Sequence, residues 1–225
     1  MVGLFSHDYV IVICLEVAQI CTNFIIMQGK NLVIVLFLVI TFGSCKKETA
    51  VENPAPLPEV EMIYSNLNDL EIKYLKDAVI DINKDNRVDL LFEVLRVGDF
   101  INKVDKFQFN ILTSIYTSVP VNSIEQIPVM QKGALVPLAN FTEYEWYSAS
   151  EINLFEKVLF ENGAVQWRGN WLTAQKAFLP FQIRINNQRH NGWIEVTADQ
   201  ANERLVLHRA AYSKLPNKDV KAGFY

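Results

Sequence analysis

One short segment of the chain carries four oxygen-bearing side chains at a spacing typical of metal-binding loops. Asp81, Asn83, Asp85 and Asp89 occupy relative positions 1, 3, 5 and 9. Calcium takes about six to eight oxygen ligands, and a tight loop can supply them because alternate residues point inward. At position 7 such loops use only the backbone carbonyl, so the Arg87 side chain is free to point away. We therefore predict a structural Ca²⁺ site formed by Asp81, Asn83, Asp85, Arg87 and Asp89.

This loop differs from an EF-hand, because Phe92 stands where an EF-hand has its bidentate glutamate and the flanking residues are strand-like. At the turn position Asn86 replaces the usual glycine, and asparagine tolerates left-handed backbone. The alternative is a β-turn rich in Asp and Asn whose side chains satisfy one another. Three carboxylates within so short a loop repel one another without a cation, which favours calcium.

A second candidate site is the aromatic cluster Tyr144, Trp146 and Tyr147. On an exposed loop these rings could stack on sugars, whereas in a buried position they would close one end of a sandwich. Burial is the favoured interpretation. The chain has no G-x-S-x-G, Walker A or H-E-x-x-H motif, so we expect no catalytic residues and a non-catalytic protein. The enzymatic alternative is a glycosidase, whose pair of carboxylates could come from Glu143, Glu145 and Glu151.

The residues that must position these sites are mostly strand-like. Residues 106–111 and 181–185 alternate polar and apolar side chains, as does 193–197 more weakly. Residues 88–97 are apolar on both faces and predict a central strand covered on both sides. Turns are expected at Asn86, Gly98, Gly133, 162–163, 186–187 and 191–192. Residues 61–225 therefore predict a single antiparallel β-sandwich, with 204–212 as a further strand.

One segment has a different pattern. Ser148 and Glu151 have the spacing of a helix capping box, and apolar residues follow at helical intervals up to Gly163. We therefore expect one short helix between residues 148 and 163.

The first part of the chain has the composition of a targeting sequence. Lys30 precedes an unbroken apolar run, Leu32–Ile40, and small residues follow. A basic start, a short apolar segment and small residues predict a secretory signal peptide over 27–44. A helix over this run would be about 14 Å long, too short for a hydrocarbon core of about 30 Å.

Residues 1–26 add little to this signal, because Glu16 and nearby polar residues interrupt any continuous apolar span. The simplest hypothesis is that translation starts at Met27 and that 1–26 is a mis-assigned upstream segment. The competing hypothesis is an extended signal anchor over 9–42. Residues 45–60 contain Pro54, Pro56 and Pro58, which predicts an extended, flexible tether.

Cys45 follows the signal segment directly. The stretch Phe42-Gly43-Ser44-Cys45 resembles a bacterial lipoprotein lipobox. This resemblance implies that Cys45 carries the lipid anchor, including palmitate, and begins the mature chain; the alternative is a plain signal peptide with a chance cysteine. Lys46 after it implies sorting to the outer membrane, facing the periplasm or the cell surface. The other cysteines, Cys14 and Cys21, lie upstream, so the mature domain has no disulfide or cysteine metal site.

The mature chain as a whole resembles a family of uncharacterised bacterial lipoproteins. These combine a lipobox cysteine, a single DxNxDxxxD loop like that of FG-GAP repeats, and a C-terminal glycine-tryptophan strand motif. Residues 81–89, 190–194, 210–212 and 216–223 match these motifs over about 75–223. The resemblance implies an exported β domain without a known substrate, and we interpret Trp193 as a core residue.

The net charge of −4 excludes a basic nucleic-acid-binding surface of the usual kind. We expect a lipid-anchored, non-catalytic binding or structural protein of the cell envelope, whose partner is a glycan or an envelope protein. The alternative is a carbohydrate-binding accessory protein that uses the aromatic cluster near Trp146.

Overall fold

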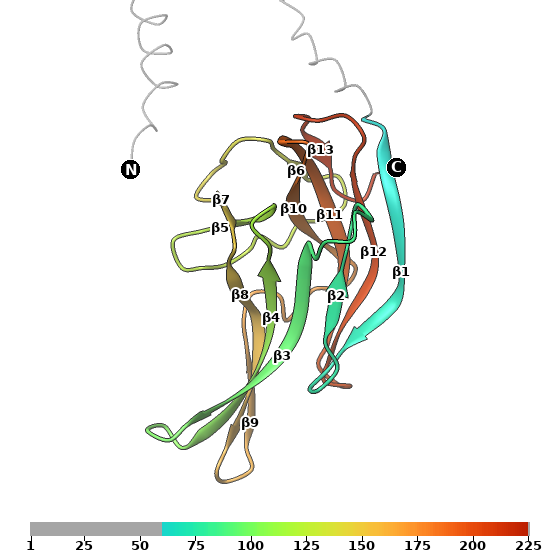
Figure 1. The fold of residues 1–225 in the computed structure, drawn as a ribbon. Helices are drawn as coiled ribbons and strands as arrows, with labels where there is room; N and C mark the ends of the chain where they lie inside the picture. Colours follow the sequence, from blue (N-terminus) through green and yellow to red (C-terminus); the bar gives the residue numbers. More distant parts are fainter. Residues whose placement is uncertain (1–59, 225) are drawn as a thin grey trace, which may run out of the picture. The chain divides into compact units, whose positions relative to one another are not determined.

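The fold is built from strands alone. The structure, a computed structural model, describes residues 60–224. Within this range every regular element is a β-strand, and neighbouring strands are antiparallel throughout. Figure 1 shows two main sheets that pack face to face. The prediction of a mainly β, antiparallel sandwich is confirmed.

The strand order of each sheet mixes near and distant parts of the chain. The six-stranded sheet runs β1 (Met62–Ile72), β12 (Arg204–Ser213), β11 (Gln188–Asp199), β10 (Ala177–Ile185), β5 (Thr117–Val121) and β7 (Glu145–Ser148). The five-stranded sheet runs β2 (Ala78–Ile80), β3 (Leu90–Asp99), β4 (Val104–Thr113), β8 (Glu151–Phe160) and β9 (Val165–Arg168). A two-stranded ribbon joins β13 (Val220–Lys221) to β6 (Leu135–Val136).

The main core lies between the two large sheets. Alternate residues of a strand face opposite sides, so Ile194, Val196 and Ala198 of β11 point into this core. Phe92 of β3 and Phe109 of β4 meet them from the five-stranded sheet and are almost fully buried. The burial of these apolar faces is the main stabilising term of the sandwich.

A second, smaller core covers part of the outer face of the six-stranded sheet. Trp193 and Ala211 are paired across β11 and β12 and point away from the main core. They pack with Phe178 and with residues of the ribbon, including Val136 and Val220. The interpretation of Trp193 as a core residue is thus confirmed, since its side chain is fully buried.

The predicted helix between residues 148 and 163 is wrong, because Glu151–Phe160 forms strand β8. The pairing of β8 with β4 is irregular: Phe155 pairs with Phe109 and Asn153 with Asn110, so Leu154 is an extra residue. Leu154 and Phe155 are both buried as a result. The spacing of apolar residues in β8 therefore resembles that of a helix. The described residues contain no helix of the length and apolarity needed to cross a membrane.

Three local expectations are also corrected. Asn191 and Gly192 lie inside strand β11 instead of a turn, and Gly98 lies inside β3. Strand β3 is covered on one face only, because Leu90 is buried whereas Leu95 is 44% exposed. The turn at 186–187 is confirmed, and it joins β10 to β11 with two residues of positive φ, as tight hairpins require.

Candidate functional site

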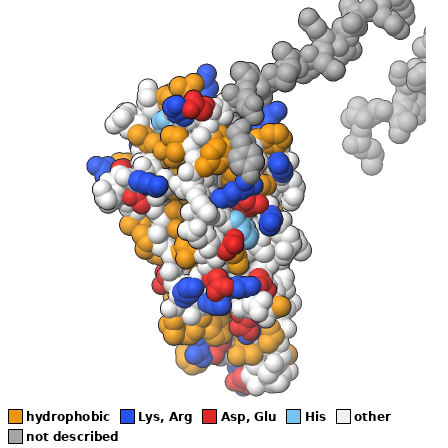
Figure 2. All heavy atoms as spheres, turned by 90° about the vertical axis from the view of Figure 1, so that its right-hand side faces the viewer, with side chains coloured by type: hydrophobic (Ala, Val, Ile, Leu, Met, Phe, Trp, Pro, Cys, Tyr) orange, Lys and Arg blue, Asp and Glu red, His pale blue; other side chains and the backbone are white. Residues whose placement is uncertain are grey.

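A cleft of about 650 Å³ lies on the outer face of the six-stranded sheet. Its walls come from β1, β11, β12, the 199–201 turn and the segment that precedes β10. Thr197, Arg204 and His208 line it with outward-pointing side chains, while their neighbours Leu205 and Leu207 lie in the main core. Figure 2 shows the β1 side of the molecule, where acidic and basic side chains lie close together.

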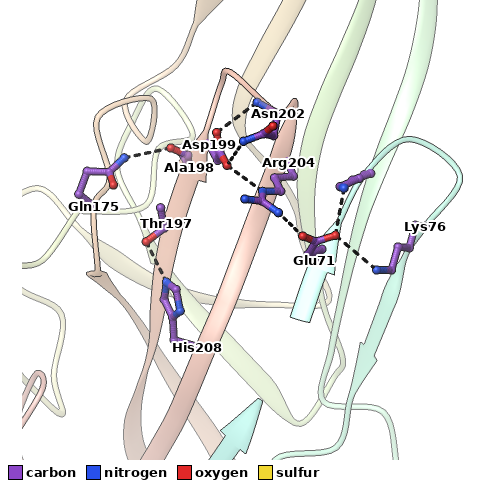
Figure 3. Close-up of polar contacts among 10 residues, drawn as sticks. Glu71, Lys76, Gln175, Thr197, Ala198, Asp199, Asn202, Arg204 and His208 are labelled. Carbon is purple, nitrogen blue, oxygen red and sulfur yellow. Dashed lines mark hydrogen bonds and ion pairs between the residues drawn. The ribbon is translucent and has the colours of Figure 1, made fainter. Parts of the chain in front are cut away.

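An ion-pair network fixes one end of this cleft (Figure 3). The guanidinium of Arg204 donates from Nε to Asp199 at 2.7 Å and from Nη1 to Glu71. Glu71 also accepts ion pairs from Lys73 at 3.0 Å and Lys76 at 3.8 Å. The network therefore joins β1 to β12 and to the end of β11. Because these groups are partly exposed, we assign the network to positioning more than to stability.

Hydrogen bonds keep the acidic members of this network ionised. The ammonium of Lys73 lowers the pKa of the Glu71 carboxyl, and Arg204 adds to the effect. The amide of Asn202 lowers the pKa of Asp199, again with a contribution from Arg204. Both carboxylates at this end of the cleft are consequently ionised at neutral pH.

At the other end of the cleft a histidine lies between an acid and a hydroxyl. Nδ1 of His208 is 2.5 Å from Oδ1 of Asp69, and its Nε2 is 2.8 Å from Oγ1 of Thr197. The backbone N–H of Lys176 donates to the same Oγ1 at 3.1 Å. His208 is mostly buried, whereas the Asp69 side chain is 76% exposed.

A β-bulge in β12 places this histidine on the cleft wall. Arg209 pairs with Glu195 of β11 and Leu207 pairs with Val196, so His208 is an extra residue without a partner on β11. A bulge bends the strand and redirects the side chain of its extra residue. His208 therefore points outward together with Arg209, whose guanidinium bonds the outward-pointing Glu195.

Strand β1 is irregular at the same level. Its residues 67–69 lie opposite His208, since pairing with β12 stops at Asn66 and resumes at Leu70. Asn68 and Asp69 have φ angles of 56° and 51°, a left-handed conformation that Asn and Asp tolerate better than most residues. The irregular backbone carries the Asp69 carboxylate to His208.

The 81–89 loop joins β2 to β3 and is held by its own side chains. Asp81 accepts from the backbone N–H of Asp85 at 3.2 Å and of Asn86 at 2.7 Å. Asn83 accepts from Asp85 N–H at 3.1 Å, and Asp85 accepts from Arg87 N–H at 2.9 Å. As expected, Asn86 adopts a left-handed conformation, with φ 67°. The predicted residues are thus brought together around one turn.

Asp89 closes this loop from inside the protein. It is 4% exposed and accepts from Ile82 N–H at 2.8 Å and from the Thr117 hydroxyl at 3.1 Å. Burial raises the pKa of Asp89, and the nearby charges of Asp81 and Asp85 raise it further. The three carboxylates therefore interact unfavourably.

The remaining features of this loop concern its capacity for a metal. The Arg87 guanidinium lies 5.3 Å from the centre of the Tyr116 ring and not over the loop. Among the residues that the structure describes, no three His, Cys, Asp or Glu side chains are arranged to hold a metal ion. In this conformation the loop carboxylates are directed to backbone N–H groups.

The structure divides the predicted aromatic cluster between two faces. The indole N–H of Trp146 donates to Ala139 O at 3.2 Å, and its ring packs with Phe141, which also stacks on Tyr144. Tyr147 follows Trp146 in strand β7 and so points to the opposite face, where it is 50% exposed. The three rings do not share one platform.

Cys45, the predicted lipidation site, lies outside the described residues. His190 is a buried strand residue whose Nδ1 lies 2.8 Å from Ser213 O.

The sequence does not indicate the cleft, because strand β1 lies far along the chain from the consecutive strands β11 and β12. Two local signals do point to it. Asn68 and Asp69 are turn-type residues inside an otherwise strand-like segment. The alternation in β12 also breaks at His208, since Leu207 and Ala210 face the same core. Both signals indicate bulges.

Comparison of the chain with protein-family models, curated proteins and solved structures found no match.

Proposed function

We propose that the protein is a lipid-anchored binding protein of the cell envelope, whose β-sandwich presents the cleft on β1, β11 and β12 to a small ligand. The observation that carries this proposal is the cleft itself. Its volume of about 650 Å³ falls in the range of small-molecule sites. The second core covers another part of this sheet face.

The walls of the cleft support binding because they combine fixed charges with apolar surface. Arg204 and Asp199 are held in place by the ion-pair network, while Leu172 and Val206 contribute apolar contacts. Groups that are already ordered lose little conformational freedom when a ligand binds.

The binding proposal can be tested by blocking the cleft. Ala201 lies on its wall and is exposed, so Ala201→Trp would fill the cleft without changing the core. Small molecules extracted from the full chain, purified from membranes, would be compared by mass spectrometry with those from Ala201→Trp. A compound present only in the wild type supports the proposal, and identical extracts would contradict it.

The membrane part of the proposal rests on Cys45 and the signal-like segment before it. Two or more acyl chains anchor a protein stably, whereas one chain binds only marginally. Labelling cells with an alkyne analogue of palmitate should mark the wild type and leave Cys45→Ser unmarked and released from membranes. Cys21→Ser is the matched control and should stay labelled. Label retained in Cys45→Ser would contradict the anchor.

We also propose that the 81–89 loop binds Ca²⁺ as a structural ion. The residue types fit, since Asp81, Asn83, Asp85 and Asp89 offer oxygens around one turn and the Arg87 carbonyl is available as a fifth ligand. Burial is the main cause of the raised pKa of Asp89, and a cation would relieve the repulsion from Asp81 and Asp85 that adds to it. With a dissociation constant of about 0.1–1 mM and about 1 mM calcium, the stabilisation is only about 0.4–1.4 kcal/mol.

Thermal melts in calcium and in chelator test the loop. The wild type should melt at a higher temperature with calcium, and Asp85→Ala should lose this difference. Asp105→Ala is a matched control, because Asp105 pairs with Arg96 on the β3–β4 hairpin. Equal melting of the wild type in both buffers would remove calcium from the proposal.

A further inference from the structure

We infer that Thr197 and His208 form a catalytic pair for the hydrolysis of small carboxylic esters in this cleft, with Asp69 as the residue that positions His208. This inference rests on the proposed role of the cleft as a binding site and assigns it a chemistry. It departs from the sequence-based expectation of a non-catalytic protein, which depended on contiguous motifs. The three residues come from β11, β12 and β1, so no contiguous motif contains them.

The hydrogen-bond roles in this group follow from the chemistry of its members. An ionised Asp69 carboxylate can only accept, so Nδ1 of His208, 2.5 Å away, must be the donor. A neutral imidazole then has Nε2 as its acceptor. The Thr197 hydroxyl lies 2.8 Å from Nε2, so it donates its hydrogen to this nitrogen.

A second contact fixes the Thr197 hydroxyl in this role. The N–H of Lys176 donates to Oγ1 of Thr197, so one of its lone pairs is occupied and its proton is directed to His208. This is the arrangement that activates a hydroxyl nucleophile: a base within hydrogen-bond reach, itself oriented by a third group.

The pair is accessible and held by unusual backbone. Thr197 and His208 both line the cleft. His208 is the extra residue of a bulge, and Asp69 lies in a left-handed stretch that a regular strand would not adopt. Bulges and strained backbone occur preferentially next to active sites, where they direct side chains.

The reaction is a two-step acyl transfer. Oγ1 of Thr197 attacks the ester carbonyl carbon and its proton passes to Nε2 of His208, while Asp69 stabilises the resulting imidazolium. The tetrahedral intermediate collapses, the bond to the alcohol oxygen breaks, and the alcohol leaves with the proton from Nε2. Water then attacks the acyl-threonine and gives its proton to Nε2. The carboxylic acid leaves, and Thr197 takes the proton back.

The walls of the cleft indicate the substrate class. The Lys176 side chain lines the cleft and forms no ion pair with any residue of 60–224, so its ammonium can stabilise the developing oxyanion. Leu172 and Val206 provide apolar surface for a short acyl chain. We therefore expect esters of short-chain acids.

The experiment uses the full chain in detergent, 4-methylumbelliferyl butyrate as substrate and a fluorophosphonate as covalent probe. The wild type should hydrolyse the ester and gain one phosphonyl group, with loss of fluoride, which peptide mass spectrometry should locate on Thr197. Thr197→Val and His208→Gln should lose activity by about 100-fold or more. Thr197→Ser should retain activity because it keeps the hydroxyl, whereas a purely structural role of Thr197 gives no reason for activity to follow the hydroxyl. Thr173→Val, at an exposed threonine beside the cleft, is the matched control.

Asp69 requires a readout of its positioning role. Asp69→Asn should lower kcat more than it raises KM, because Asp69 acts on the reaction through Nδ1 of His208. Labelling of the wild type keeps the test valid if a variant fails to fold.

Binding of the amide analogue of the ester substrate, measured by saturation-transfer NMR, separates the catalytic pair from the proposed binding role of the cleft. If the analogue binds but the ester is not hydrolysed and the probe does not label the protein, the catalytic pair is overturned and the binding cleft remains. If the analogue does not bind and the probe does not label the protein, the catalytic pair is overturned and small esters are removed as ligands of the cleft.

Discussion

The carboxylate of Asp69 lies 2.5 Å from Nδ1 of His208 at a place where β1 and β12 both depart from regular pairing. The contact depends on the left-handed backbone of β1 as much as on the two side chains. The backbone and side-chain contributions of Asp69 can therefore be separated by substitution.

Asp69→Gly and Asp69→Ala both remove the carboxylate, but only alanine is strained at φ 51°. A left-handed conformation costs a non-glycine residue about 1–2 kcal/mol. We expect Asp69→Ala to unfold at a lower denaturant concentration than Asp69→Gly, by about 1 kcal/mol in free energy. At Glu71, inside the regular part of β1, the order should reverse. Equal stabilities of the two Asp69 variants would mean that its backbone is not left-handed.

Gly192 is required by packing inside strand β11. A Cβ at this position would lie 2.3 Å from Cζ of Phe181 and 2.4 Å from the backbone oxygen of Ala211. Because the backbone cannot move away, Gly192→Ala should destabilise the protein by about 3 kcal/mol in chemical unfolding. Gly163→Ala is the control: its Cβ would meet nothing within 4 Å, so only its φ of 81° adds a cost of about 1 kcal/mol. Similar losses at both sites would contradict the packing.

The two fully buried tryptophans should respond differently to phenylalanine. The indole N–H of Trp171 donates to Ile127 O at 3.1 Å, whereas that of Trp193 has no hydrogen-bond partner among residues 60–224. Both substitutions remove a similar volume, but only Trp171→Phe also removes a hydrogen bond. We expect Trp171→Phe to cost about 1 kcal/mol more in free energy of unfolding. The reverse order would show that the Trp193 indole N–H is satisfied.

Stability without calcium should depend on pH through Asp89. Its pKa is raised above 3.8 in the folded protein by burial, so the folded state holds this proton more tightly than the unfolded chain. The stabilising contribution is complete below pH about 4 and is lost as the pH rises through the higher folded value. In chelator, the wild type should lose stability relative to Asp89→Asn between pH about 4 and neutrality. Parallel pH curves would contradict this.

Asp99 should behave in the opposite way, because the Asn102 amide, the Asn102 N–H and Lys106 hold its pKa at about 2. An acid with a lowered pKa stabilises the fold above its ordinary value of 3.8 and loses this contribution as the pH falls to about 2. A carboxyl ¹³C titration should give a midpoint near 2 in the wild type, and Asn102→Ala should raise it. A midpoint near 3.8 in the wild type would contradict these contacts.

The period-two strands could be predicted from sequence because one buried face imposes the pattern directly. Residues 106–111 lie in β4 and residues 181–185 in β10. Strand β8 could not be assigned in this way, since the extra residue Leu154 changes which side chains face the core. The same limit applies to the cleft, because its bulges depend on strand pairing, and β1 is distant in sequence from its partner β12.

Among the candidate sites too, those formed by neighbouring residues could be predicted from sequence, and those formed by long-range pairing could not. The 81–89 loop is local, so its spacing predicted the turn in which its side chains meet. The aromatic cluster is local too, but the alternation of β7 separates Tyr147 from Trp146. Asp69 and His208 are 139 residues apart, and only the folded sheet brings them together.

The extra residue at His208 has a consequence for how this site could arise and disappear. Removing that single codon would make Leu207 and Arg209 consecutive residues, paired with Val196 and Glu195. Every other side chain of β11 and β12 would keep its inward or outward direction. The β11–β12 ladder is thus complete without the histidine. A single-residue insertion into a finished sandwich is enough to create the base, and a homologue that lacks it would keep the architecture and lose the chemistry.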